Sequence, residues 1–164
     1  MPSLIQTLRE ETVLLQLAAE TSEEVVNALA DRLHRLGYVH DTFAGAVMQR
    51  ETKHPTGLVL SGSVHAAIPH TDPQHVIRAG LALATLEKEV VFQNMIAPEE
   101  AVPVRLVFLM ALDQGQSQIE MLVEIARILQ NEDLVNGLIA ARDFSEVQAL
   151  LAGMGMPLGQ SISQ

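Results

Sequence analysis

Apolar residues recur every three to four positions in several segments of the chain, which is the spacing of one helix face. Residues that cap helices precede these segments, and Thr21 with Glu24 forms a capping-box pattern. Gly37 stands where a left-handed cap ends the first helix. The expected helices run from Thr21 to Leu36, from Asp41 or Thr42 to about Glu51, from Ser117 to Leu129, from Asn131 to Ile139 and from Ser145 to Leu151.

Between the second and third of these helices, the pattern changes to short, continuous apolar runs that are typical of buried strands. The expected strands cover residues 56–60, 64–68, 76–86 and 102–112, and residues 87–98 form a polar connection or a hairpin region. Near the N-terminus, residues 4–17 fit a helical turn followed by a further short strand.

Two helices, a group of strands and three more helices therefore follow one another, without an internal repeat. This order predicts an α/β fold, in which a mixed β-sheet of about four to five strands is sandwiched between helices on both faces. Residues 1–153 are expected to form one domain. The Gly-, Ser- and Gln-rich residues 154–164 are expected to be a flexible C-terminal tail.

Composition narrows the classes of function. The chain has 164 residues, of which 48% are apolar, and a formal net charge of −10. An acidic protein repels nucleic acids and anionic membrane surfaces. The charge either serves solubility alone or favours encounter with a basic protein partner. The absence of cysteine excludes disulfides, thiolate nucleophiles and cysteine-ligated metal.

Neither a signal peptide nor a membrane span is expected. The first residues, Met1-Pro2-Ser3-Leu4, lack the basic and then apolar pattern of a signal peptide. The most apolar run, residues 102–112, contains Pro103 and Arg105 and is too short to cross a bilayer. We therefore expect a cytoplasmic protein without direct membrane insertion.

His70 is the first candidate for chemistry. It comes directly after Pro69, which cannot donate to a strand ladder, so His70 is expected at a strand end beside a surface or cleft. A neutral imidazole is a good nucleophile near pH 7 and can form a covalent intermediate. The alternative is an ordinary surface histidine where a strand meets a loop.

Arg50, near the end of the second expected helix, is the next candidate. Its planar guanidinium can grip phosphate oxygens with two parallel hydrogen bonds. The alternative is a surface arginine that the helix dipole favours near a C-terminus.

Metal and cofactor sites are not expected. His65 and His75 flank His70 at equal spacing, but an odd separation along a strand puts side chains on opposite faces. The phosphate-binding patterns GxxxxGK[ST] and GxGxxG are absent from the sequence.

Taken together, these segments resemble the fructose/mannitol-type enzyme IIA domains of sugar phosphotransferase systems. The resemblance covers about residues 5–151, and within the family the galactitol-specific IIA proteins are the most similar. The runs that carry it are Gly37 to Phe43, Arg50-Glu51, His54-Pro55-Thr56-Gly57, Ala67-Ile68-Pro69-His70, Val104 to Ala111 and Gln118 to Ala126.

The resemblance implies that His70 is a phosphorylated histidine. It would accept a phosphoryl group from the histidine of the carrier protein HPr and pass it to a cysteine of the IIB subunit, which serves the membrane component IIC. Arg50 would steady the phosphoryl oxygens, and Gln118 would contact the same site. Glu51 is expected to be a structural hydrogen-bonding residue. One ring nitrogen of His70 should take the phosphoryl group, while the other bonds a carbonyl or a side chain.

Three residues depart from the family pattern. Gln118 stands where many members carry a second active-site histidine, and its amide can donate a hydrogen bond but cannot relay a proton. Galactitol-type members resemble this chain in having glutamine there. Thr71 and Ala66 stand where a smaller residue and a branched aliphatic residue are usual.

Two other functions stay open at this point. One is a regulatory protein of the same fold, like the nitrogen-related IIA proteins, which signals through a phosphohistidine. The other is a binding module without phosphoryl transfer. The preference for galactitol uptake rests on the resemblance alone.

Overall fold

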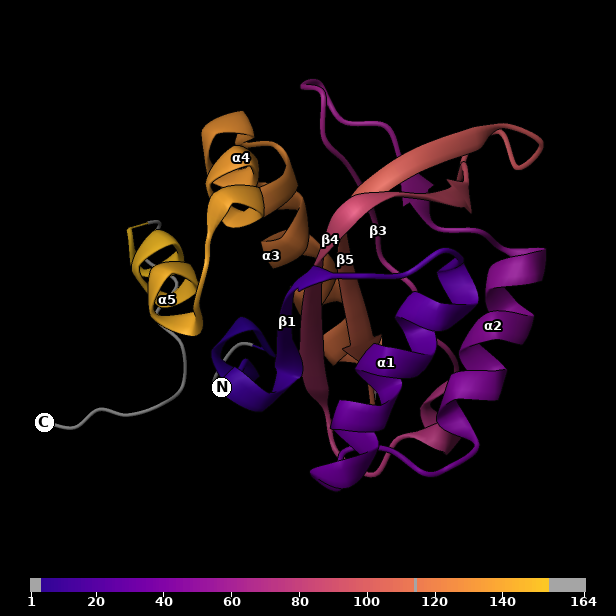
Figure 1. Cartoon of the computed structure of the whole chain (residues 1–164). Helices are drawn as coiled ribbons and strands as arrows, with labels where there is room; N and C mark the ends of the chain where they lie inside the picture. The colour runs from indigo at the N-terminus through magenta and orange to yellow at the C-terminus, as the bar shows by residue number, and fades with distance from the viewer. Residues whose placement is uncertain (1–3, 114, 154–164) are drawn as a thin grey trace, which may run out of the picture.

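The computed structural model describes residues 4–113 and 115–153 (Figure 1). Its elements alternate from helical to extended and back, in the order expected from the sequence. The strands are β1 (Val13–Leu17), β2 (Gly57–Leu58), β3 (His65–Ala67), β4 (Gly80–Gln93) and β5 (Ala101–Ala111). The α-helices are α1 (Ser22–Arg35), α2 (Phe43–Lys53), α3 (Gly115–Leu129), α4 (Glu132–Ala140) and α5 (Phe144–Ala152). Short 3-10 helices are η1 (Leu4–Thr7), η2 (Glu10–Thr12) and η3 (Pro73–His75).

The five strands form one mixed sheet in the order β1-β4-β5-β3-β2. β4 and β5 are antiparallel partners at its centre, whereas β1 lies parallel to β4 and β3 lies parallel to β5. The short edge strand β2 is antiparallel to β3. The expected α/β fold with a mixed sheet is confirmed.

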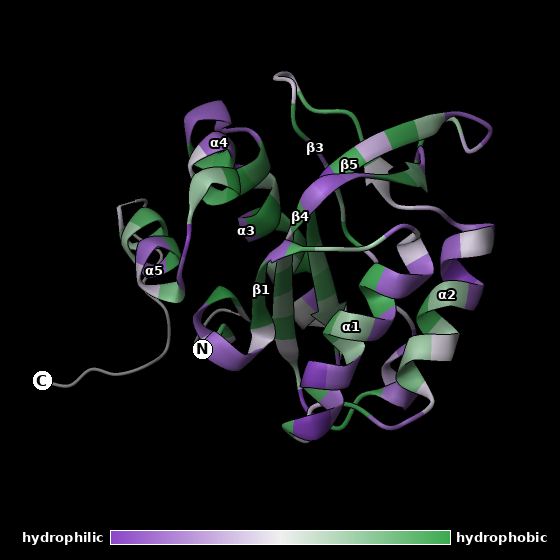
Figure 2. Ribbon diagram, in the orientation of Figure 1, coloured by the Kyte–Doolittle hydropathy of each residue, from purple (hydrophilic) through white to green (hydrophobic). Residues whose placement is uncertain are grey.

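Side chains of the central strands alternate between two apolar clusters, because successive residues of a strand point to opposite faces. On β5, Leu106 and Phe108 join one cluster, and Val107 and Leu109 join the other. The first cluster is covered by η1, α3, α4 and α5, and the second by α1 and α2 (Figure 1). Figure 2 shows the sheet between them as mostly hydrophobic. Helices on both faces are therefore confirmed.

The expected strand boundaries were partly wrong. Residues 87–93 continue β4, and the hairpin loop occupies only residues 94–100. The polar run Glu87-Lys88-Glu89 is exposed and lies where the register between β4 and β5 shifts, so it resembles a loop in sequence. Beyond it, buried Val90 and Phe92 pair with β5 again. β4 also begins at Gly80, four residues later than expected.

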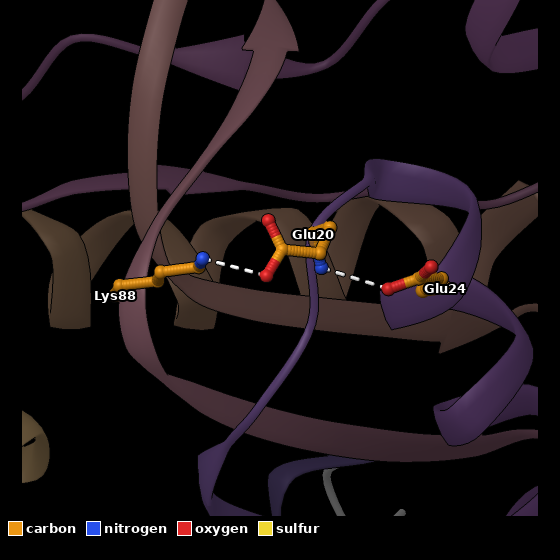
Figure 3. Close-up of polar contacts among 3 residues, drawn as sticks. All are labelled: Glu20, Glu24 and Lys88. Carbon is orange, nitrogen blue, oxygen red and sulfur yellow. Dashed lines mark hydrogen bonds and ion pairs between the residues drawn. The ribbon is translucent and has the colours of Figure 1, made fainter.

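Helix α1 begins and ends as the sequence predicts. The Thr21 hydroxyl accepts a hydrogen bond from the Glu24 amide, and Gly37 has a positive φ of 82° after the last turn. The Glu24 carboxylate accepts from the Glu20 amide at 2.7 Å, and Lys88 of β4 pairs with the Glu20 carboxylate at 2.6 Å (Figure 3). This exposed pair joins the start of α1 to the sheet.

Three other helix boundaries differ from expectation. α2 continues to Lys53, just before the His54-Pro55 stop. α3 begins at Gly115, so Ser117 lies within its first turn rather than before it. The cap of α5 is Asp143, whose carboxylate accepts from the Glu146 amide, and not Ser145. The Asn131 cap of α4 is confirmed by its bond from the Leu134 amide.

The expected tail, residues 154–164, lies outside the described residues. Within the described ranges, every helix is too short or too polar to pass through a lipid bilayer.

Candidate functional site

His70 lies at the end of β3, where the chain leaves the sheet. Buried Pro69 separates it from the last β3 residues, and the Pro69 carbonyl accepts a hydrogen bond of 3.1 Å from the Met110 amide of β5. Strand pairing thus continues up to Pro69 and stops there, because a proline offers no amide proton of its own. The expected strand-end position of His70 is confirmed, and its side chain is partly buried.

The imidazole of His70 is oriented by its own backbone. Its Nδ1 lies 2.9 Å from the Ile68 carbonyl oxygen. A carbonyl oxygen only accepts hydrogen bonds, so this contact requires the proton on Nδ1. In the neutral ring, Nε2 then carries the free electron pair and is the nucleophilic nitrogen. The sequence predicted one oriented nitrogen without indicating which, and the geometry now assigns it as Nδ1.

The surroundings of His70 favour the neutral ring. Burial lowers the pKa of His70 below its ordinary value of 6.5, and the positive charge of Arg50 lowers this pKa further. The hydrogen bond to Ile68 and the charge of Asp72 act in the opposite direction without reversing the shift. At pH 7 the imidazole is therefore mostly neutral and available as a nucleophile.

Arg50, on the last turns of α2, lies close enough to His70 for its charge to act on the imidazole. Its Nε atom is buried and has no hydrogen-bond partner among residues 4–113 and 115–153. A buried N–H without an acceptor costs free energy, so this group is suited to an acceptor that arrives with a ligand. The oxygens of a phosphoryl group would meet that need.

A polar cleft of about 250 Å³ opens between the end of α2 and the segment that follows His70. Arg50, Lys53 and His54 line it from the helix side, and Thr71, Asp72 and His75 from the other. The cleft thus gathers two cations and two histidines, beside the carboxylate of Asp72, in a chain that is acidic as a whole.

Glu51 is not among the residues that line the cleft and is only 8% exposed. Its carboxylate accepts two hydrogen bonds of 2.9 Å, from the amide and from the hydroxyl of Thr56. Burial raises the pKa of Glu51 above 4.5, although the bonds from Thr56 and the charge of Arg50 oppose this shift. Its expected role as a structural hydrogen-bonding residue agrees with these contacts.

Gln118 lies in the first turns of α3 and is half-buried. A short connection joins α3 to the end of β5, where Met110 bonds Pro69, so α3 begins at the same sheet edge as His70. In the described part of the chain, no hydrogen bond joins Gln118 to His70. The structure therefore brings His70 and Arg50 within electrostatic reach of each other, and it places Gln118 on the helix that begins at the same end of the sheet.

Sequence reasoning missed two parts of this site. Thr56 was noted only as part of a motif, yet its hydroxyl also accepts a bond of 3.2 Å from the Ile68 amide. Lys53 and His54 were not considered as cleft residues. Across the described ranges, acidic, histidine and cysteine side chains form no group of three that would hold a metal ion.

A titration of His70 tests this electrostatic description. Followed by NMR, the imidazole should titrate with a pKa below 6.5, and Arg50→Gln should raise that pKa because a positive charge is removed. His70 of the unfolded chain, with its ordinary pKa of 6.5, binds a proton at a higher pH than His70 of the folded protein does. The His70 contribution to folding stability therefore declines as pH falls from 6.5 to the folded pKa. An unshifted pKa, or one unchanged by Arg50→Gln, would contradict the assigned environment.

Comparison with known proteins was decisive for the family. The sequence profile described as "Phosphoenolpyruvate-dependent sugar phosphotransferase system, EIIA 2" matches residues 6–154. The galactitol-specific EIIA component of Escherichia coli K12 is 32% identical over 117 residues, which are 71% of this chain and 76% of that protein. The mannitol-specific EIICBA component of Vibrio cholerae is 27% identical over 92% of this chain, but the chain spans only 22% of its length.

A solved structure extends the similarity to the whole fold. The complex of the enzyme IIA for mannitol with the phosphorylated enzyme IIB for mannitol, from Escherichia coli, matches with a TM-score of 0.73 and 25% identity. The match covers 89% of this chain and 97% of that chain. The chain therefore belongs to the EIIA type 2 family of the phosphoenolpyruvate-dependent sugar phosphotransferase system, whose IIA domains are phosphotransferases that carry a phosphohistidine.

Proposed function

We propose that this protein is the cytoplasmic IIA component of a sugar permease, which accepts a phosphoryl group from phospho-HPr on Nε2 of His70. The observation that carries the proposal is the bond from His70 Nδ1 to the Ile68 carbonyl, beside Arg50. This contact holds one nitrogen protonated and leaves the other as a nucleophile. Residues 1–153 form the catalytic domain in this proposal, with residues 154–164 as an appended tail.

The reaction needs little proton chemistry. The Nε2 electron pair forms a bond to phosphorus as the bond from phosphorus to the HPr histidine breaks. The HPr ring leaves with the electron pair of the broken bond. In this loose transition state, negative charge is spread over the three equatorial oxygens. Arg50 would stabilise that charge, and this role is supported by its buried Nε, which lacks an acceptor among the described residues. A IIB cysteine thiolate then attacks the same phosphorus, and His70 leaves as the neutral ring.

Gln118 is proposed to donate an amide hydrogen bond to the phosphoryl oxygens. A neutral hydrogen bond is a modest contribution, so Gln118→Ala should slow transfer about threefold to tenfold. Single-turnover transfer from phospho-HPr measures the effect, and Gln116→Ala is a control on the preceding part of the same helix. A rate equal to that of the unchanged protein would remove Gln118 from the site.

The exposed surface of α3 supports the proposal that this protein binds partner proteins. Ile119, Leu122 and Val123 of α3 are 62%, 40% and 56% exposed. Residues at this spacing share one helix face, so an apolar stripe faces outward close to where β5 meets Pro69. Protein interfaces commonly have an apolar centre with charged residues around it. The net charge of −10 would speed encounter with a basic partner such as HPr.

Galactitol is the proposed substrate of the permease, because the galactitol-specific component is 32% identical to this chain. A regulatory protein that keeps its phosphoryl group is the competing function. A reconstituted chain of enzyme I, HPr, this protein and purified galactitol IIB separates the two. Phosphoryl transfer to the IIB cysteine is expected. Stable phosphorylation of His70 without transfer to IIB would instead support a regulatory function. Transfer only to the IIB of another sugar would overturn the assignment of galactitol as the substrate.

A further inference from the structure

The hydrogen bonds that surround Ile68 lead from the His70 ring to a buried carboxylate. The carbonyl of Ile68 accepts from His70 Nδ1, and the amide of Ile68 donates to the Thr56 hydroxyl oxygen at 3.2 Å. That hydroxyl in turn donates to the Glu51 carboxylate at 2.9 Å. Thr56 is 3% exposed, so water does not readily replace either of its bonds.

The direction of these bonds follows from the chemistry of each group. A hydroxyl has one proton, and here it is used toward Glu51, which leaves the oxygen to accept from Ile68. The second carboxylate oxygen of Glu51 accepts from the Thr56 amide. An ionised Glu51 therefore offers one oxygen to each of the two Thr56 donors, whereas an amide would place an NH2 donor at one of these two positions.

This Glu51–Thr56 pair also stabilises the turn that follows α2. Glu51 belongs to α2 and Thr56 follows Pro55, so their two bonds hold the turn that leads from the helix to the edge of the sheet. Arg50 is the neighbour of Glu51 on that helix, and its charge acts on the His70 ring. The same carboxylate thus fixes the segment that presents Arg50 and the backbone that orients His70.

The backbone of Ile68 is constrained at its amide, by Thr56, and at the residue that follows it, Pro69. The Ile68 amide donates to the Thr56 hydroxyl at 3.2 Å and makes a longer bond, of 3.4 Å, to the Thr56 carbonyl. On the other side, Pro69 restricts the backbone and its carbonyl bonds Met110 of β5. Removing the hydroxyl would leave the Ile68 amide with only its longer bond to the Thr56 carbonyl.

We propose that Glu51 and Thr56 are positioning residues for phosphoryl transfer, which hold the Ile68 carbonyl where it keeps the His70 proton on Nδ1 and hold Arg50 beside the ring. The transfer part of this inference rests on the proposed function of His70. The orientation of the unphosphorylated ring does not depend on it. Phosphoryl transfer is sensitive to such placement, because an error of about 1 Å can lower a rate about 100-fold.

The test compares Thr56→Val, which removes the hydroxyl at nearly constant volume, with Thr56→Ser, which keeps it. Side-chain ¹⁵N NMR reports which ring nitrogen of His70 carries the proton, and single-turnover transfer from phospho-HPr gives the rate. In Thr56→Val the proton should distribute between both nitrogens, and transfer should slow by up to about 100-fold. Thr56→Ser should retain the orientation and most of the rate. Glu51→Gln should resemble Thr56→Val.

Unfolding by urea gives the stability of each variant, so that loss of the fold is recognised separately. A folded Thr56→Val protein with an unchanged ring proton and an unchanged rate would overturn the inference. A Thr56→Ser protein that behaves like Thr56→Val would overturn it too, because packing of the methyl group would then be responsible. If the unchanged protein accepts no phosphoryl group, the proposed function fails, and the ¹⁵N signals still decide whether Thr56 orients His70.

Discussion

His70→Ala should abolish phosphoryl uptake from phospho-HPr, because it removes the ring whose Nδ1 is held by the Ile68 carbonyl and whose Nε2 is left as the nucleophile beside Arg50. The unchanged protein should gain the mass of one phosphoryl group, which mild acid removes as expected of a phosphoramidate. Intact-protein mass spectrometry after incubation with enzyme I, HPr and phosphoenolpyruvate measures both properties.

His54→Ala is the matched control for this variant. His54 is exposed and lines the same cleft as Arg50, so it has access to the same partner. Its replacement should leave the gain in mass intact. A His70→Ala protein that is still labelled, or a His54→Ala protein that is not, would assign the phosphoryl group to another histidine.

Arg50→Ala should have the second largest effect, a fall in transfer rate of about 100- to 1,000-fold, which is typical when a preorganised donor to a developing charge is removed. Arg50→Lys should recover only part of the rate, because an ammonium group cannot make two parallel bonds in the plane of the guanidinium. Single-turnover kinetics with phospho-HPr measure these rates.

Lys53→Ala controls for the general loss of positive charge. Lys53 is exposed on the last turn of α2 and lines the same cleft, so its removal changes the net charge as Arg50→Ala does. It should lower the rate far less than Arg50→Ala. Equal effects of the two variants would indicate that the cleft attracts the partner by charge alone, and would remove Arg50 from the transition state.

The sequence was sufficient for the features that depend on local chemistry. Proline before His70 predicted a strand end, and Thr21 and Gly37 predicted the limits of α1. The continuous apolar runs between two groups of helices predicted a sheet covered on both faces. The family resemblance then connected His70 with Arg50, which lie far apart in sequence. The structure places them within electrostatic reach of each other.

Features that depend on distant parts of the chain could not be predicted in the same way. The second half of β4 forms because Val90 and Phe92 pair with β5, although the charged residues before them suggest a loop. The bond from Ile68 to Thr56 joins two segments whose register is set by β2 and β3 together. The need for glycine at position 57, beside Thr56, also depends on a distant segment, because a Cβ there would lie 2.6 Å from the Gln93 carbonyl oxygen.

The central claim concerns one atom, Nε2 of His70, and the phosphorylated protein tests it directly. Protein labelled with ¹⁵N in its histidines and phosphorylated through HPr can be followed by ³¹P and ¹⁵N NMR. The structure predicts a single phosphohistidine at residue 70, with phosphorus bonded to Nε2 and the proton retained on Nδ1 toward the Ile68 carbonyl. Phosphorus on Nδ1, on another histidine or on no histidine would contradict this account of the site.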